Sequence, residues 1–214
     1  MKELFVVYAY TVSMDVDAQN GFTPICPNEL PVPNGNRIVE ECNKNATKAV
    51  YRYMSKDAHP PKSAWAIDKP VLTPIEGLKN VDCVWPTHCV VGTHGFELLD
   101  GLPKPCEYNF LVYKGVEQDM HPYSPIYHDL GKKISTGVIE KAKFDEVDTF
   151  ILGGLALDYC LGEAAFDLKN AGFRVIINLG ATKAIGDEKA FVEKAEKAGI
   201  EFVNSADEIT ELPF

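Results

Sequence analysis

The fold of this chain follows from the stretch Phe150-Ile-Leu-Gly-Gly-Leu-Ala-Leu-Asp-Tyr-Cys160. Its apolar first half predicts a buried strand over 147–153, and the two glycines predict a turn. Apolar residues then recur at helical spacing, which predicts a helix over 158–171; they are Leu161, Ala164, Ala165 and Leu168. The stretch therefore predicts a strand, a tight turn and a helix that begins near a cysteine.

The same alternation continues toward the C-terminus. Strands are expected over 173–179 and 200–204 and a helix over 187–198, with Gly172 and Gly199 ending the two helices. Strands that alternate with helices form a parallel sheet covered by helices. We therefore expect an α/β fold: a three-layer, Rossmann-like, mostly parallel sheet of about six strands with helices on both faces.

The N-terminal half follows this rhythm less cleanly. It predicts strands over 11–17, 48–55 and 109–114, and helices over 35–45 and 136–142. Between residues 59 and 109 a proline-rich stretch predicts a long loop, whose aromatic and histidine content favours a functional role. The apolar segment 4–10 is expected as an extra edge strand or a subunit contact. We predict one domain over 1–214, with a metal-binding loop region around 57–108.

Composition excludes several classes of function. The chain has 214 residues, of which 46% are hydrophobic and 24% charged, as in a soluble protein with a substantial core. Its net charge of -10 disfavours partners such as nucleic acid or an anionic membrane. No apolar run has the length of a transmembrane helix, and residues 4–12 lack a cleavage site. We expect a cytoplasmic protein.

The six cysteines do not form a structural framework. None belongs to a C-x-x-C pair, so a zinc ribbon or a thioredoxin site is not expected. Cys160 differs from the others because a helix N-terminus favours a thiolate, the nucleophilic form of the side chain. The alternative is that Cys160 is a small buried apolar residue.

Candidate catalytic groups follow the carboxyl ends of the predicted strands, where parallel sheets bind ligands. Asp17 could accept the proton of Cys160, and Lys114 could stabilise the resulting anion. Taken singly, Asp17 also fits a turn residue and Lys114 a solvated strand end. Their shared position at strand ends favours one crevice that holds all three.

A second cluster predicts a metal. Asp57 and His59 are two apart on an extended segment and so point the same way, and His88 could join them from the long loop. Three protein ligands with an open position are typical of a catalytic metal site, and zinc, iron or manganese would fit. The alternative is three polar loop residues in water. The remaining histidines are expected at the surface or as supporting donors; they are His94, His121 and His128.

The chain resembles nicotinamidases of the isochorismatase-like cysteine hydrolase superfamily. The matching pieces occur in the family's order and span most of the chain; they are Asp17-Ala-Gln-Asn-Gly-Phe22, Lys56-Asp57-Ala-His59-Pro60, Trp85-Pro-Thr-His88-Cys89, Tyr113-Lys114-Gly115 and Gly154-Leu-Ala-Leu-Asp-Tyr-Cys160. The glycine-rich turn with its cysteine marks the superfamily, and the metal-binding pieces mark its nicotinamidase branch.

The resemblance implies a role for each matching residue. Asp17, Lys114 and Cys160 would be the catalytic triad, and a cis peptide at Leu155–Ala156 would let the Ala156 and Cys160 N–H groups form an oxyanion hole. Asp57, His59 and His88 would hold a divalent metal, zinc first and Fe²⁺ or Mn²⁺ as alternatives. The residues expected to line the substrate pocket are Phe22, Trp85, Leu155 and Tyr159. Many relatives carry a second histidine shortly after the His59 equivalent, and here Ser63 stands near that place.

By the resemblance, the chain would be a hydrolase of linear amides that converts nicotinamide to nicotinate and ammonia in NAD salvage, through a cysteine thioester. Two other functions remain open: hydrolysis of another small amide, such as a carbamoyl or ureido compound, or metal binding on an inactive hydrolase scaffold. Homo-oligomers are common in this family, and the acidic charge does not exclude one.

Overall fold

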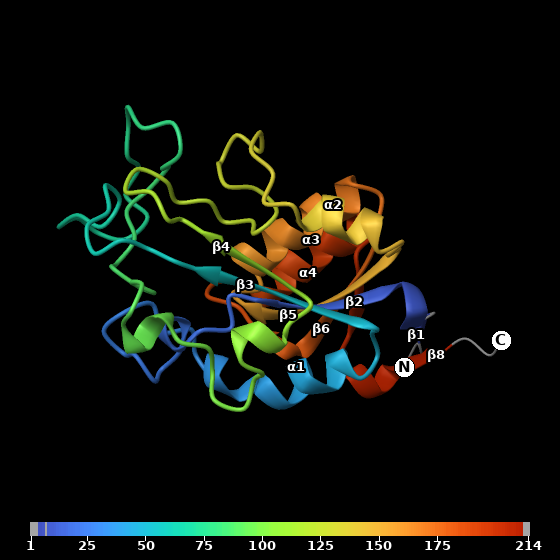
Figure 1. Ribbon diagram of the computed structural model, residues 1–214. Coiled ribbons are helices and arrows are strands. Elements are labelled where there is room, and N and C mark those ends of the chain that lie inside the picture. Colours follow the sequence, from blue (N-terminus) through green and yellow to red (C-terminus); the bar gives the residue numbers. More distant parts are fainter. Residues whose placement is uncertain (1–3, 7, 212–214) are drawn as a thin grey trace.

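The computed structural model of the chain describes residues 4–6 and 8–211. Its centre is a six-stranded sheet in the order β4-β3-β2-β5-β6-β7, and every pairing in it is parallel. Figure 1 shows this sheet with helices above and below it. The strands are β2 (Thr11–Val16), β3 (Tyr51–Asp57), β4 (Phe110–Lys114), β5 (Thr149–Leu155), β6 (Arg174–Lys183) and β7 (Glu201–Val203). The helices are α1 (Val39–Ala46), α2 (Val138–Phe144), α3 (Cys160–Asn170) and α4 (Glu188–Lys197).

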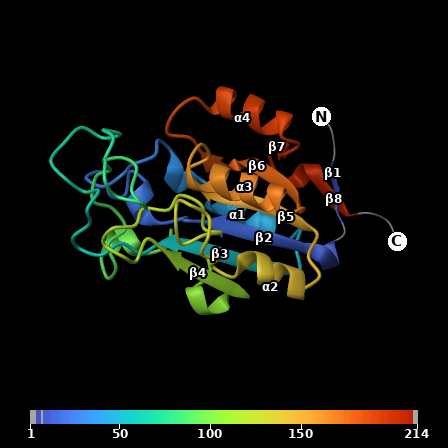
Figure 2. The ribbon, with the colours of Figure 1, turned by 90° about the horizontal axis from the view of Figure 1, so that it is seen from above.

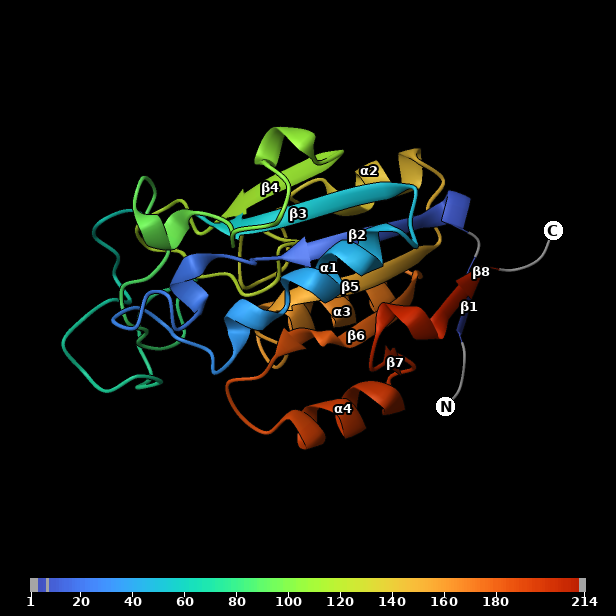
Figure 3. The same cartoon turned by 90° about the horizontal axis from the view of Figure 1, so that it is seen from below.

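The helices cover both faces of the sheet. Figure 2 shows α2, α3 and α4 on one face, and Figure 3 shows α1 on the other. Alternation along β5 fits this arrangement, because Phe150 and Leu152 pack with α3, whereas Ile151 packs on the opposite side. Burying one such side chain contributes about 1.5–3 kcal/mol. The predicted three-layer α/β fold is confirmed.

Element boundaries differ from the predictions where local hydrogen bonds intervene. The helix expected over 35–45 divides into a 3-10 turn, Gly35–Arg37, and α1. The strand expected from residue 48 starts at Tyr51, because the N–H groups of Thr47 and Lys48 bond back to carbonyls at the end of α1. These shifts of a few residues leave the strand order intact.

The N-terminal segment does not form the single edge strand that was one expectation for residues 4–10. β1 (Leu4–Val6) pairs in parallel with β8 (Ile209–Glu211) in a separate two-stranded sheet, and Tyr8–Tyr10 is a 3-10 turn. Val7 lies outside the described residues. Leu4 and Ile209 are buried against Ile151 and Ile176, so this small sheet extends the core on the side away from α3.

The predicted long loop is present. Between β3 and β4 the structure shows two 3-10 turns, His94–Phe96 and Pro105–Glu107. It shows no α-helix and no β-strand in this region, all of which the structure describes. This region lies beyond the carboxyl ends of the strands, where the strand arrows point in Figure 1. The Gln19 side chain fixes it there by donating to the carbonyls of Asp57 (2.9 Å) and Phe96 (3.0 Å). Among the described residues, no helix is long and apolar enough to cross a membrane.

Candidate active site

The sheet brings four sequence-predicted residues to one edge. Asp17 follows β2, Asp57 ends β3, Lys114 ends β4, and Cys160 begins the helix after β5. These strands are neighbours in the order β4-β3-β2-β5. Strand order reverses between β2 and β5, where parallel sheets leave a crevice.

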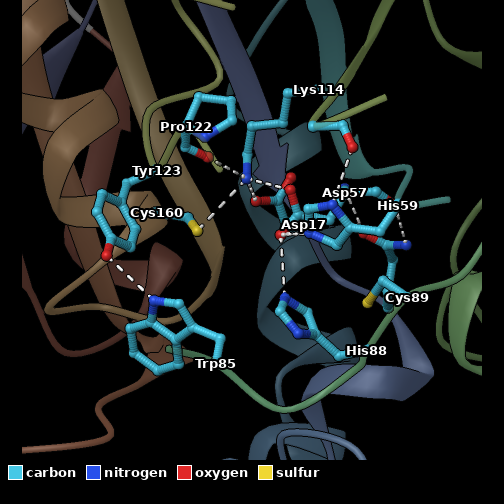
Figure 4. A network of polar contacts seen from close by, with 12 residues as sticks. Asp17, Asp57, His59, Trp85, His88, Cys89, Lys114, Pro122, Tyr123 and Cys160 are labelled. Atoms are coloured by element: carbon cyan, nitrogen blue, oxygen red, sulfur yellow. Dashed lines mark hydrogen bonds and ion pairs between the residues drawn. The ribbon is translucent and has the colours of Figure 1, made fainter. Parts of the chain in front are cut away.

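Lys114 contacts each of the other three residues of this group (Figure 4). Its Nζ donates to Asp57 Oδ1, to the Pro122 carbonyl (3.1 Å) and to Cys160 Sγ (3.6 Å), and it pairs with Asp17 Oδ2 at 3.1 Å. The lysine is fully buried, so the alternative of a solvated strand end is wrong. An ammonium with three hydrogen bonds inside the protein fixes the relative positions of the carboxylates and the thiol.

Asp17 is held by its neighbours in an exact orientation. Its Oδ1 accepts a 2.6 Å hydrogen bond from Ser55, which leaves Oδ2 facing Lys114. Atoms of Asp17, Asp57 and Cys160 lie within 4.8 Å of one another. Burial raises the pKa of Asp17, and Lys114 opposes this rise. A carboxylate with a raised pKa, close to a thiol, suits a proton acceptor.

Two opposing effects act on the pKa of the Cys160 thiol. Burial raises this pKa well above its usual value, and the Lys114 ammonium acts in the opposite direction. Because burial disfavours the thiolate, a proton acceptor beside the thiol matters for its reactivity, and the Asp17 carboxylate lies within 4.8 Å.

The turn before Cys160 has the predicted geometry. The Leu155–Ala156 peptide bond is cis, as expected. Gly154 adopts φ +118°, and a Cβ there would lie 1.9 Å from the Val16 carbonyl oxygen, so no other residue fits between β2 and β5. Cys160 is the first residue of α3, and N–H groups in a first helical turn lack partners within the helix. The Cys160 N–H is thus free to meet a ligand.

Asp57 connects the triad residues to the predicted metal ligands. Its Oδ2 lies 3.5 Å from His59 Nε2 and 3.8 Å from His88 Nε2. Although burial alone would raise the pKa of Asp57, Lys114 and His59 hold it well below the usual value. All three residues are buried, so the alternative of polar loop residues in water is wrong.

One histidine of this cluster was missed. His121 was expected at the surface or as a supporting donor, yet it is 5% exposed, and one of its ring nitrogens lies within 4.8 Å of ligand atoms of His59 and His88. The surface expectation is wrong because the loop after β4 turns back over the strand ends. By contrast, His94 is exposed, with 64% of its side chain accessible.

A narrow cavity, open to solvent, lies beside Cys160. Aromatic residues line it, and they include the predicted Phe22, Trp85 and Tyr159 together with Tyr123, which sequence reasoning missed. Trp85 Nε1 donates to the Tyr123 hydroxyl at 3.1 Å (Figure 4). Among the described residues, Leu155 is not part of the lining; its side chain is buried in the core below. The cavity suits a small, flat molecule.

Comparison with known proteins places this geometry in context. No family model matches the chain. The nicotinamidase of Acinetobacter baylyi is 29% identical over 174 residues, which cover 79% of each chain. A solved nicotinamidase and pyrazinamidase of Acinetobacter baumanii has a TM-score of 0.83 at 26% identity, over 93% of this chain and 98% of that one. A pyrazinamidase of Pyrococcus horikoshii, solved in complex with zinc, has a TM-score of 0.70 at 25% identity, over 91% of this chain and 98% of that one.

Proposed function

We propose, from the premise that this chain belongs to the nicotinamidases of the isochorismatase-like cysteine hydrolase superfamily, that it hydrolyses nicotinamide to nicotinate and ammonia. The observation that supports this most is the buried group of Asp17, Lys114 and Cys160 at the wall of an aromatic cavity. A flat heteroaromatic amide fits such walls by stacking and presents its carboxamide to the thiol.

In the proposed first half-reaction, Asp17 takes the Cys160 proton as the sulfur attacks the amide carbon. The C–N bond then breaks, and Asp17 returns this proton to the leaving nitrogen, which departs as ammonia. A thioester joins the substrate acyl group to Cys160. Lys114 keeps Asp17 and Cys160 in register throughout, through its contacts at 3.1 and 3.6 Å.

The second half-reaction reverses these roles. Asp17 takes a proton from water as the water oxygen attacks the thioester carbon, the C–S bond breaks, and the sulfur regains the proton. In both halves, the N–H groups of Ala156 and Cys160 would stabilise the negative oxygen. One such donor is typically worth about 3 kcal/mol in the transition state.

The residues around Asp57 fit a divalent cation. His59 Nδ1 lies 2.9 Å from the Gly115 carbonyl and His88 Nδ1 2.6 Å from the Pro86 carbonyl; since a carbonyl only accepts, each Nδ1 carries its hydrogen. Burial lowers the pKa of His88, which favours the neutral ring, and the Nε2 of this ring faces Asp57 Oδ2 at 3.8 Å. A cation between these two groups would satisfy both of them.

Asp57, His59 and His88 are the proposed ligands, and zinc is the proposed metal. Histidine nitrogen and carboxylate oxygen are common zinc ligands, and Fe²⁺ and Mn²⁺ accept the same set. When bound, the metal supplies a Lewis acid that orients the substrate ring beside the thiol.

The test is ammonia release from nicotinamide, measured before metal removal, after chelation, and after zinc, iron or manganese is restored. Benzamide is the matched control substrate, because it has the same shape and amide but no ring nitrogen. We expect nicotinamide turnover that chelation abolishes and metal restores, with benzamide much poorer. A carbamoyl or ureido compound turned over far faster than nicotinamide would overturn the choice of substrate. If no amide is hydrolysed although metal binds, the scaffold is a binding protein.

The proposed reaction implies a cellular role and a location for the protein. Nicotinate is a precursor from which NAD can be rebuilt, so a role in NAD salvage follows from the reaction. The six cysteines are all free thiols, which is typical of the reducing cytoplasm and supports a cytoplasmic location. We include a homo-oligomer in the proposal because homo-oligomers are common in this family. Size-exclusion chromatography with light scattering would measure the oligomeric state.

A further inference from the structure

We propose that His121 is a third histidine ligand of the metal, supplied by the loop after β4. This inference rests on the proposed metal site and goes beyond it, because it assigns the ligand to a segment that none of the matching sequence pieces contains. Ser63, which stands where many relatives have a histidine, makes its own bond elsewhere, to the Pro60 carbonyl at 3.5 Å.

The ring of His121 is buried without a polar partner. Neither Nδ1 nor Nε2 has a hydrogen-bond partner, although the residue is only 5% exposed. A buried nitrogen without a partner is unfavourable, because it has lost its hydrogen bond to water and gained none in the protein. His59 Nε2 is also buried and without a hydrogen bond, although it faces Asp57. Unpaired ring nitrogens that converge on one point indicate a missing ligand common to them.

The distances suit such a ligand after a small contraction. Ligand atoms of His59, His88 and His121 lie within 4.8 Å of one another. Zinc–nitrogen bonds of about 2.0–2.1 Å place tetrahedral ligands about 3.4 Å apart, so each ring would move inward by less than about 1 Å. Together with Asp57, the set would be three nitrogens and one carboxylate, and the substrate ring would then need a fifth position on the metal.

The backbone holds His121 in place for this role. Its N–H donates to the Asn80 carbonyl at 2.7 Å, and the preceding Met120 carbonyl accepts from Trp65 Nε1 at 3.2 Å. The following Pro122 carbonyl accepts from Lys114 Nζ. Three successive residues are thus tied to the loop between β3 and β4 and to Lys114, and metal ligands need outer support of this kind.

The neighbouring rings set the direction of the imidazole. His121 stacks on His59 (centroids 5.4 Å, 12°) and on Trp85 (5.8 Å, 16°), while Trp65 meets it edge-on at 4.6 Å. These contacts fix the plane of the ring. The placement also puts the ligand directly against Trp85, so metal occupancy would order the wall of the substrate cavity.

The experiment counts histidines on the metal independently of catalysis. The zinc-loaded full chain is studied by X-ray absorption, whose multiple scattering reports the number of imidazole ligands, and zinc affinity is measured by competition with a chromophoric chelator. We expect three imidazoles in the unaltered protein and two in His121→Ala, with affinity lowered about 100-fold or more. His94→Ala, an exposed histidine, and Ser63→Ala are the matched controls and should leave both readouts unchanged.

Two imidazoles in the unaltered protein, or an affinity of His121→Ala within threefold of it, would overturn the proposal. Circular dichroism of the metal-free variant verifies that it is folded, and His121→Gln provides a second variant if alanine fails. The result is separable from the proposed function. Three imidazoles without nicotinamide hydrolysis would leave this inference standing, whereas hydrolysis with two imidazoles would overturn this inference alone.

Discussion

Two parts of the candidate site are held in different ways. The strand-end group, defined as Asp17, Asp57, Lys114 and Cys160, lies at the termini of neighbouring strands and is tied together by one buried ammonium. The loop group, defined as Trp85, His88, His121 and Tyr123, comes from two segments with little regular structure. It is fixed by ring contacts and single hydrogen bonds to carbonyls.

The difference indicates that the sheet and the loops have separate functions. The sheet holds the reacting groups firmly. Moving the end of β2, β3 or β5 would disturb ladder bonds on both sides of that strand, and moving the edge strand β4 would disturb its bonds to β3. The loops form the walls and the metal site, whose shape can change without altering the sheet. Chemistry should therefore depend most on the strand-end group, and substrate choice on the loop group.

The largest effect is expected for Cys160→Ala. If the thiol forms the proposed thioester, its loss should lower kcat for nicotinamide by about 10⁴-fold or more. Zinc content and thermal stability should remain close to those of the unaltered protein, since the metal ligands are untouched. Cys106→Ala, at an exposed thiol, is the control and should keep full activity. Substantial turnover by Cys160→Ala would rule out the covalent mechanism.

The next effect concerns stability. Lys114→Met leaves the buried carboxylates of Asp17 and Asp57 without their shared cation, which should lower the free energy of unfolding by about 3–5 kcal/mol. Urea denaturation of metal-depleted protein measures this without compensation by zinc. The control is Lys132→Met. That lysine, 41% exposed, pairs with the exposed Glu163 and with the buried Asp167, so its loss should cost less than that of Lys114, about 1–2 kcal/mol. Equal losses would mean that the strand-end group is no more tightly coupled than the surface.

The comparison also explains what the sequence could predict. The strand-end group was predictable, because apolar runs locate strands and parallel strands end at one edge. Asp17 and Cys160 are 143 residues apart in sequence, and the sheet alone brings them together. The rule that parallel strands end at one edge of the sheet was enough to predict that these residues form one cluster.

The loop group was predicted only in part. Trp85 and His88 were found by resemblance, but His121 and Tyr123 were missed. Their placement depends on single bonds between loops, such as His121 N–H to the Asn80 carbonyl, and no periodic pattern encodes such a bond. The separate β1–β8 sheet was missed for a similar reason. Each of its two strands is only three residues long, and the two strands come from opposite ends of the chain.

A smaller effect is expected in the loop group. Trp85→Ala removes a wall of the cavity and should raise KM for nicotinamide about 10- to 100-fold while changing kcat less, as expected for lost ground-state binding. Trp85→Phe keeps an aromatic wall and loses only the hydrogen bond to Tyr123, so KM should change less than about fivefold. Steady-state kinetics with nicotinamide provide both values. A large fall in kcat with unchanged KM would assign Trp85 to the chemistry instead.

The smallest effect is a local response to acid in the loop after β4, which connects this strand to α2. Asp129 Oδ1 accepts from the N–H groups of Lys133 (2.9 Å) and Ile134 (2.8 Å). Although burial alone would raise the pKa of Asp129, these backbone donors lower it below its usual value near 3.8. A carboxylate whose pKa is lower in the folded protein stabilises it above the usual pKa, and this contribution is lost as pH falls through the folded value.

Residues 129–134 should therefore lose hydrogen-exchange protection as pH drops below about 4, while β2 and β5 stay protected. Asp129→Asn keeps the size but weakens the acceptor, so it should show the same loss already at pH 7, by about 1 kcal/mol in local opening. Asp68→Asn, in the other loop, is the control. If β5 exchanged as early as residues 129–134, the loops and the sheet would open as one unit, and the distinction between the two groups would fail.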